Sequence, residues 1–122
     1  MGYIECMRAL RRAAVFLLAA LLLLADGPGF RSRKQFEEHY AKHGREFGNI
    51  SPDEYLHRAQ ALRDAPVGGP ILEAVKAGGI VTRFDRRTGA FGAYNADRTI
   101  RTFFIPNNGE RYFRRQANRR YD

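Results

Sequence analysis

Cysteine is almost absent from this sequence, and the single one, Cys6, lies in the N-terminal segment. The rest of the chain therefore has no internal disulfide, which neither requires nor excludes an oxidising compartment. Lysine is scarce after this segment, with only Lys34, Lys42 and Lys76, so arginine carries most of the positive charge. There is no internal repeat or low-complexity run, and 122 residues leave room for one domain.

A long hydrophobic run is also missing. The apolar segment from Ala13 to Ala25 has 13 residues, whereas crossing a bilayer takes about 20. Three arginines precede it and Asp26-Gly-Pro-Gly29 follows it. A basic start before a short apolar core is typical of a signal peptide. This pattern predicts a secreted or cell-envelope protein whose mature chain begins near residues 26–30.

The same N-terminal segment is compatible with two alternatives. It could be an uncleaved anchor that associates the protein with a membrane, or the start codon could be wrongly assigned. In either case we divide the chain into a leader, residues 1–29, and a folded domain, residues 30–122. The leader carries a net charge of +1 and the domain +7.

This basic charge predicts a polyanionic partner for the domain. Nucleic acid and an anionic membrane surface are the natural candidates. Arginine suits phosphate because its planar guanidinium donates two hydrogen bonds to one group. A solvated basic surface that aids solubility is the alternative.

Helices are expected in the first half of the domain. One covers residues 33–47, with Ser32 as its cap and Gly48 as its stop. Its apolar face contains Phe36, Tyr40, His43 and Phe47 at helical spacing. A second helix begins at Ser51-Pro52 and ends before Pro66. A short third helix is predicted at residues 71–77.

Strands are expected in the second half, where β-branched and aromatic residues alternate with glycine-containing turns. They are predicted at residues 80–84, 91–94 and 99–105, with a fourth at 110–113 before a frayed tail. The order predicts an α+β fold with two to three N-terminal helices packed on one face of a three- to four-stranded antiparallel β-meander. The other face of the sheet would then be exposed.

Four motifs in this order carry a family resemblance. They are Phe36-x-x-His-Tyr-x-Lys-His-Gly-x-Glu-Phe-Gly48, Ser51-x-x-Glu-Tyr-Leu-x-x-Ala59, Phe84-Asp-x-x-Thr-Gly-x-Phe-Gly92 and Asp97-x-x-Ile-Arg-Thr-Phe-Phe-x-Pro106. Together they resemble the nuclease domains that end bacterial polymorphic toxins, which are colicin D-like and belong with the barnase, EndoU and RelE-like ribonucleases. The resemblance covers nearly all of residues 31–113. The sequence departs from the family pattern at Arg98-Thr99, where a glycine is usual, and in having a leader instead of a long stalk.

The resemblance implies a metal-independent endoribonuclease without a cofactor, acting on tRNA or other structured RNA. The 2′-hydroxyl would attack the phosphate and leave a 2′,3′-cyclic phosphate. It also implies an acidic immunity protein as partner, and we expect a monomer. One alternative is a non-catalytic basic module that binds RNA or a protein at the cell envelope, and another is a structural cell-envelope protein whose charge meets anionic lipid.

Metal-independent RNA cleavage needs a proton acceptor, a proton donor and groups that stabilise extra charge on phosphorus. His43 is the leading candidate for proton transfer, because histidine titrates near neutral pH and Gly44 beside it would allow close approach. A hydrogen-bonded core histidine is the alternative. The predicted catalytic residues are Lys42, His43, Arg101 and Thr102. The predicted RNA-binding residues are His39, Arg83, Tyr94, Arg111 and Tyr112.

The same helix carries side chains that could bind a zinc ion. His39 and His43 lie four residues apart and Glu46 follows, but Tyr40 occupies the position of the glutamate in a His-Glu-x-x-His motif. No cysteine is near, so no metal site is predicted. His57 is expected on the solvent side of the second helix.

Overall fold

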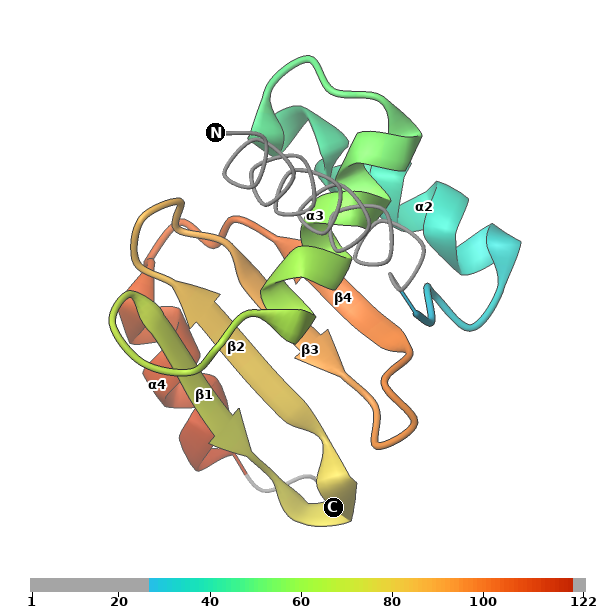
Figure 1. Ribbon diagram of the computed structural model, residues 1–122. Coiled ribbons are helices and arrows are strands. Elements are labelled where there is room, and N and C mark those ends of the chain that lie inside the picture. Colours follow the sequence, from blue (N-terminus) through green and yellow to red (C-terminus); the bar gives the residue numbers. More distant parts are fainter. Residues whose placement is uncertain (1–26, 120–122) are drawn as a thin grey trace, which may run out of the picture.

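The computed structural model describes residues 27–119. The predicted leader therefore lies outside the described residues except for its last three positions. Two helices, α2 (Arg33–His43) and α3 (Pro52–Asp64), precede a four-stranded antiparallel sheet, and a further helix follows it (Figure 1). The predicted α+β fold, with N-terminal helices and an antiparallel β-meander, is confirmed.

The two N-terminal helices begin where their capping residues predict. The Ser32 hydroxyl accepts a hydrogen bond from the Gln35 amide, and Ser51 accepts one from Glu54, each at 3.1 Å. The expected single helix over residues 33–47 is divided, because the 3₁₀ turn η1 (Gly44–Phe47) follows α2. Gly48 ends η1 with a φ of 93°.

Gly44 has a different role from the predicted one. A Cβ atom at this position would lie 2.7 Å from the ring of Tyr40, so the glycine is buried under that ring. Gly44 therefore allows the turn from α2 into η1 to pack on Tyr40, and it is closed to a substrate. The Tyr40 hydroxyl donates to the Ile50 carbonyl at 2.6 Å, which holds the turn against α2.

The sheet is a simple meander of β1 (Ile71–Val75), β2 (Val81–Asp85), β3 (Phe91–Tyr94) and β4 (Ile100–Phe104). The predicted helix at residues 71–77 is wrong, because most of it forms β1. Glu73 lies opposite Arg83 in the β1–β2 register, and their side chains are 2.6 Å apart. A segment of five residues is too short for its periodicity to distinguish a helix from a strand, so the pairing with β2 decides its conformation.

The predicted strand at residues 110–113 is also wrong. Residues Glu110–Asn118 form the helix α4, which also replaces most of the predicted frayed tail. Glu110 lies in the first turn of α4, where a negative charge is favourable, and pairs with Arg114 one turn later at 3.0 Å. Phe113 is buried against the sheet and provides the packing that makes this short helix stable.

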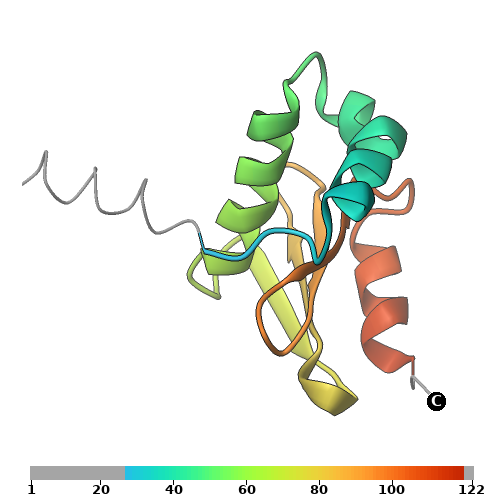
Figure 2. The ribbon, with the colours of Figure 1, turned by 90° about the vertical axis from the view of Figure 1, so that its right-hand side faces the viewer.

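Helices cover both faces of the sheet, so the prediction of one exposed face is wrong. Helix α3 packs on one face and α4 on the other, while α2 lies along the β4 edge (Figures 1 and 2). On the α3 face the buried Tyr55 hydroxyl donates to the Phe103 carbonyl at 2.5 Å. On the α4 face the core is formed by Phe84, Phe91, Ala93 and Phe113.

A short strap, residues 27–31, ties the start of the described chain to this core. The Gly29 carbonyl accepts a hydrogen bond from the Ile100 amide at 2.9 Å, and the buried Arg63 guanidinium donates to the Pro28 carbonyl. The ring of Phe30 stacks between the helices on Phe36 and His39. Within residues 27–119 no helix has the length and apolar character needed to cross a membrane.

Candidate functional site

Two adjoining pockets open between α2 and α4, above β4. The histidine pocket, about 560 Å³, is lined by Glu38, His39, Lys42, His43, Thr102, Phe104 and Tyr112. The amide pocket, about 360 Å³, is lined by Arg31, Gln35, His39, Phe91, Ala93, Asn95, Ile100, Arg101, Thr102, Tyr112 and Gln116. His39, Thr102 and Tyr112 belong to both, so the two pockets are adjacent and together are called the cleft.

This cleft contains six of the residues predicted from the sequence. All four predicted catalytic residues lie there: Lys42 and His43 on α2, and Arg101 and Thr102 on β4. His39 and Tyr112, two of the predicted RNA-binding residues, complete the group. They come from three elements that are separated by up to 73 positions in the sequence, so only the packing of α2 and α4 beside β4 brings them together.

His43 is held in place by a carboxylate. Its Nδ1 atom lies 2.6 Å from Oε2 of Glu46, and its ring stacks on Phe104 with centroids 5.1 Å apart. The other oxygen of Glu46 accepts a hydrogen bond from the Ile105 amide at 2.8 Å. The acceptor on Nδ1 places a hydrogen there, so Nε2 of the neutral ring carries the free lone pair. His43 thus has the geometry of a general base oriented by a second residue.

His39 is held differently. Its ring stacks on Phe30 at 5.0 Å and lies 6.0 Å from the ring of His43. Burial lowers the pKa of His39, and the neighbouring His43 and Lys42 lower it further against an opposing effect of Glu38. Its buried Nδ1 atom has no hydrogen-bond partner among residues 27–119. A hydrogen on Nδ1 would therefore be a buried donor without an acceptor, which favours the tautomer with the hydrogen on Nε2.

A β-bulge places Arg101 in the cleft. The register pairs Ala93 with Thr102 but Tyr94 with Ile100, so Arg101 is the extra residue. In a regular strand Arg101 and Thr102 would point to opposite faces; here both line the amide pocket. The Arg101 guanidinium donates to Oδ1 of Asn95 at 2.8 Å, which holds it at the pocket wall.

Tyr112 forms the wall between the two pockets. Its ring contacts Phe91 and Phe104 edge to face, with centroids 5.0 and 5.3 Å apart. These contacts fix a partly exposed aromatic ring at the point where α4 faces α2. A tyrosine ring beside both pockets can take part in stacking with a flat ligand group.

Two predicted RNA-binding residues lie elsewhere and are structural. Arg83 is on the opposite face of the sheet, where its guanidinium donates to the carbonyls of Leu62 and Ala65 and pairs with Glu73. Tyr94 is 1% exposed and its hydroxyl donates to the Ala59 carbonyl at 2.7 Å. Burial raises the pKa of that hydroxyl, so it stays a neutral donor. Strand alternation alone does not distinguish the two faces, because both are apolar.

Arg111 is exposed on α4 beside Tyr112 but does not line either pocket. His57 is exposed on α3, as expected. Sequence analysis missed several residues of the site. It considered Glu46 only as a metal ligand, and it did not place Phe30, Gln35 or Gln116 near the candidate catalytic residues. The spacing of three residues between His43 and Glu46 on one helical turn was the available signal for their contact.

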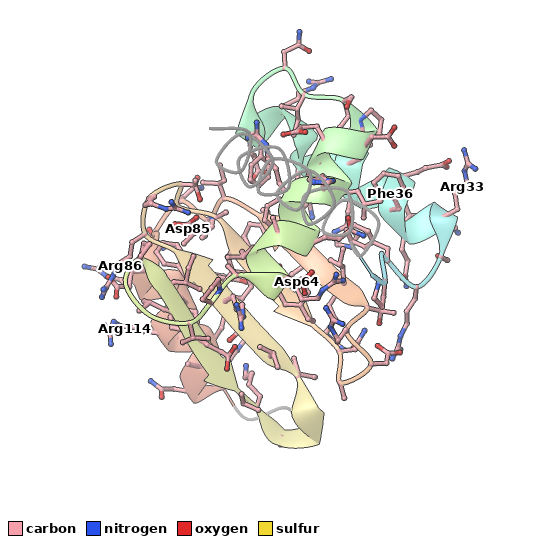
Figure 3. The ribbon with its side chains drawn as sticks, in the orientation of Figure 1. Arg33, Phe36, Asp64, Asp85, Arg86 and Arg114 are labelled. Carbon is pink, nitrogen blue, oxygen red and sulfur yellow. The ribbon has the colours of Figure 1, made fainter. Side chains whose placement is uncertain are left out.

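Acidic residues pair with many of the arginines that lie away from the cleft. Glu110 bonds both Arg86 and Arg114, at 2.6 and 3.0 Å, beside β1 and α4, and Arg33 projects outward from α2 and bonds Glu37 (Figure 3). Within residues 27–119, the following cations have no acidic partner: Lys42, Arg45, Arg101, Arg111, Arg115 and Arg119. Lys42 and Arg101 line the cleft and can attract an anion, while Glu38 is the acidic residue of the histidine pocket.

Metal ligands do not cluster in this part of the chain: across residues 27–119 no group of three or more histidine, cysteine, aspartate or glutamate side chains is placed to hold a metal ion. No protein-family model matches the sequence, and no curated protein matches it either.

Proposed function

We propose that this domain is a metal-independent endoribonuclease that cleaves RNA by attack of the 2′-hydroxyl on the neighbouring phosphate. The observation that carries the proposal is the convergence of His39, Lys42, His43, Arg101 and Thr102 on one cleft, with His43 oriented by Glu46. RNA cleavage by the 2′-hydroxyl requires a general base, a proton or hydrogen-bond donor, and cations that stabilise the charge on phosphorus. On the family resemblance we expect the substrate to be tRNA or another structured RNA.

His43 acts as the general base in this proposal. Its Nε2 lone pair accepts the proton of the 2′-hydroxyl as the 2′-oxygen bonds to phosphorus. The bond from phosphorus to the 5′-oxygen then breaks, and the proton returns from His43 to that oxygen directly or through water. The products are a 2′,3′-cyclic phosphate and a free 5′-hydroxyl. Glu46 stabilises the positively charged imidazole between these two proton transfers.

His39 has a complementary role. Its lowered pKa keeps the ring neutral, and its Nε2–H donates a hydrogen bond to a non-bridging phosphate oxygen. Lys42 and Arg101 add positive charge around the pentacoordinate phosphorus, where it is worth most. The Thr102 hydroxyl, in both pockets, donates to the phosphate or to the 2′-oxygen. The two histidines thus use opposite tautomers for different tasks.

Incubation of the purified protein with total RNA and with 5′-labelled tRNA, with and without EDTA, tests the proposal. We expect cleavage that survives EDTA and fragments that end in a 2′,3′-cyclic phosphate. Cleavage abolished by EDTA would contradict metal independence. Salt-sensitive RNA binding without cleavage at any protein concentration would reject catalysis and favour the basic binding module instead.

A further inference from the structure

We propose that the amide pocket is a base-recognition subsite, and that Gln35 and Gln116 determine which nucleotide it accepts. This inference rests on the proposed function, since the phosphate of the same nucleotide would lie in the histidine pocket. The amide pocket has a volume of about 360 Å³, which is near the lower end of the range for small-molecule sites. It joins the histidine pocket through His39, Thr102 and Tyr112.

The floor and walls of the pocket suit a flat heteroaromatic ring. Phe91, Ala93 and Ile100 provide an apolar floor, and Tyr112 stands at the side held by two edge-to-face contacts. A base whose phosphate is bound at the histidines would enter beside Tyr112, and its face can stack on that ring. An apolar floor alone would accept any base, so discrimination must come from the polar groups of the walls.

Two glutamine side chains from different helices line this pocket. Gln35 comes from the first turn of α2, and Gln116 from the last turn of α4. Neither side chain makes a hydrogen bond within residues 27–119. A primary amide presents a donor and an acceptor side by side, which matches the edge of a base. Two such groups in one pocket can together hydrogen-bond to the edge of a single base.

Asn95 and Arg101, two other polar residues of the pocket, are engaged with each other. Asn95 is buried, with Oδ1 accepting from Arg101 and Nδ2 donating to the Thr99 hydroxyl, each at 2.8 Å. Asp97 in turn accepts from that hydroxyl at 2.6 Å. This chain of hydrogen bonds holds Arg101 and Asn95 together at the pocket wall. His39 and Thr102 are assigned to the phosphate in the proposed reaction, so Gln35 and Gln116 are the side chains proposed to respond to the identity of the base.

The pocket could instead hold a second backbone phosphate, since Arg31 and Arg101 line it. Base recognition is favoured because Arg31 already pairs with Asp97, at 4.0 Å. A phosphate site of this size would also not need an apolar floor. The two possibilities predict different results: a phosphate site would bind all four nucleotides with similar affinity, whereas a base subsite would bind one nucleotide more tightly than the others.

Binding of the four nucleoside 3′-monophosphates to the purified full-length protein is the test, measured by isothermal titration or equilibrium dialysis. We expect one nucleotide to bind at least about tenfold more tightly than the weakest, the size of one good base contact. Gln116→Ala and Gln35→Ala should each reduce that ratio to within about threefold and leave the weakest nucleotide's affinity unchanged. The exposed Asn118→Ala, on the same helix but outside the pocket, is the matched control and should keep the full ratio.

Equal binding of all four nucleotides, or no binding, would overturn the inference. An undiminished ratio in both glutamine variants would overturn it as well. Gln35 is exposed and makes no side-chain hydrogen bond within the described chain, so its variant is expected to fold even if Gln116→Ala does not. Because binding needs no catalysis, a base preference in a protein that fails to cleave RNA would support the subsite and reject only the proposed reaction.

Discussion

The carboxylate of Glu46 connects His43 of α2 to the end of β4: one oxygen lies 2.6 Å from Nδ1 of the imidazole and the other accepts the Ile105 amide at 2.8 Å. The carboxylate is thereby fixed at both ends. The imidazole is fixed in turn by Glu46 and by the ring of Phe104 beneath it. This arrangement restrains the orientation of His43 before any substrate arrives, which is the condition for efficient general-base catalysis.

His43→Ala should reduce RNA cleavage by about 10²–10⁴-fold, because general-base catalysis contributes a factor of this size. RNA affinity should change little, since it comes from several distributed cations. Rates on labelled tRNA, with circular dichroism and a melting curve on the same sample, measure both effects. His57→Ala, exposed on α3, is the control and should keep full activity. A folded His43→Ala protein that cuts at nearly the wild-type rate would remove His43 from the mechanism.

Glu46→Gln should lower the cleavage rate by about 10²-fold or more with little change in KM, because it alters the tautomer of His43. The glutamine carbonyl can still accept the Ile105 amide, so its NH₂ group would face Nδ1 and donate to it. The imidazole hydrogen would then move to Nε2, and the base would lose its lone pair. An unchanged melting temperature separates this effect from a loss of stability. A kcat close to that of the wild type would argue against a positioning role.

The lowered pKa of His39 predicts that the protein becomes less stable in mild acid. Below its ordinary value of 6.5 the unfolded chain binds a proton at His39 that the folded protein resists. This contribution to stability is therefore fully present above pH 6.5 and is lost as the pH falls toward the folded pKa. Urea unfolding of wild type and His39→Phe in mildly acidic and in neutral buffer should show a smaller pH dependence in the variant. Equal pH dependence in the two proteins would contradict the assignment.

Tyr94→Phe distinguishes a structural tyrosine from an RNA-binding one. Loss of the buried hydrogen bond to the Ala59 carbonyl leaves an acceptor without its donor, which should cost about 1–3 kcal/mol of unfolding free energy. RNA cleavage at a temperature where the variant is folded should be unchanged. Tyr112→Leu is the comparison: its ring lines both pockets, and its loss should weaken RNA binding. A selective loss of RNA affinity in Tyr94→Phe would show that this tyrosine contacts RNA after all.

Local signals predicted the helical half of the fold well. Ser32 and Ser51 cap α2 and α3 as expected, because a hydroxyl that accepts from an amide three residues ahead depends only on neighbouring residues. The strands β2, β3 and β4 also lie close to their predicted positions, since turns at Gly89 and at residues 95–98 separate segments of clear β character. The errors at β1 and α4 concern short segments that depend on the sheet for their conformation.

Only part of the candidate site could be predicted from the sequence, because residue type can be read locally but the face of the sheet on which a residue lies cannot. Residue chemistry was enough to select His43, Lys42, Arg101 and Thr102, all of which line the cleft. It was not enough for Arg83 and Tyr94, which bond to backbone carbonyls around α3 on the opposite face. A basic or aromatic residue on a strand has the same local pattern whichever helix covers its face.

The amino-acid sequence by itself determined most of the order of helices and strands, the basic charge and the supply of proton-transferring groups, because each depends on local propensity or on composition. Only the tertiary structure decided which of these groups meet. The bulge at Arg101, the packing of α4 through Phe113, and the contact of Glu46 with both His43 and Ile105 all depend on segments distant along the chain. Their formation is governed by burial and hydrogen-bond satisfaction across the whole fold, which no local pattern encodes.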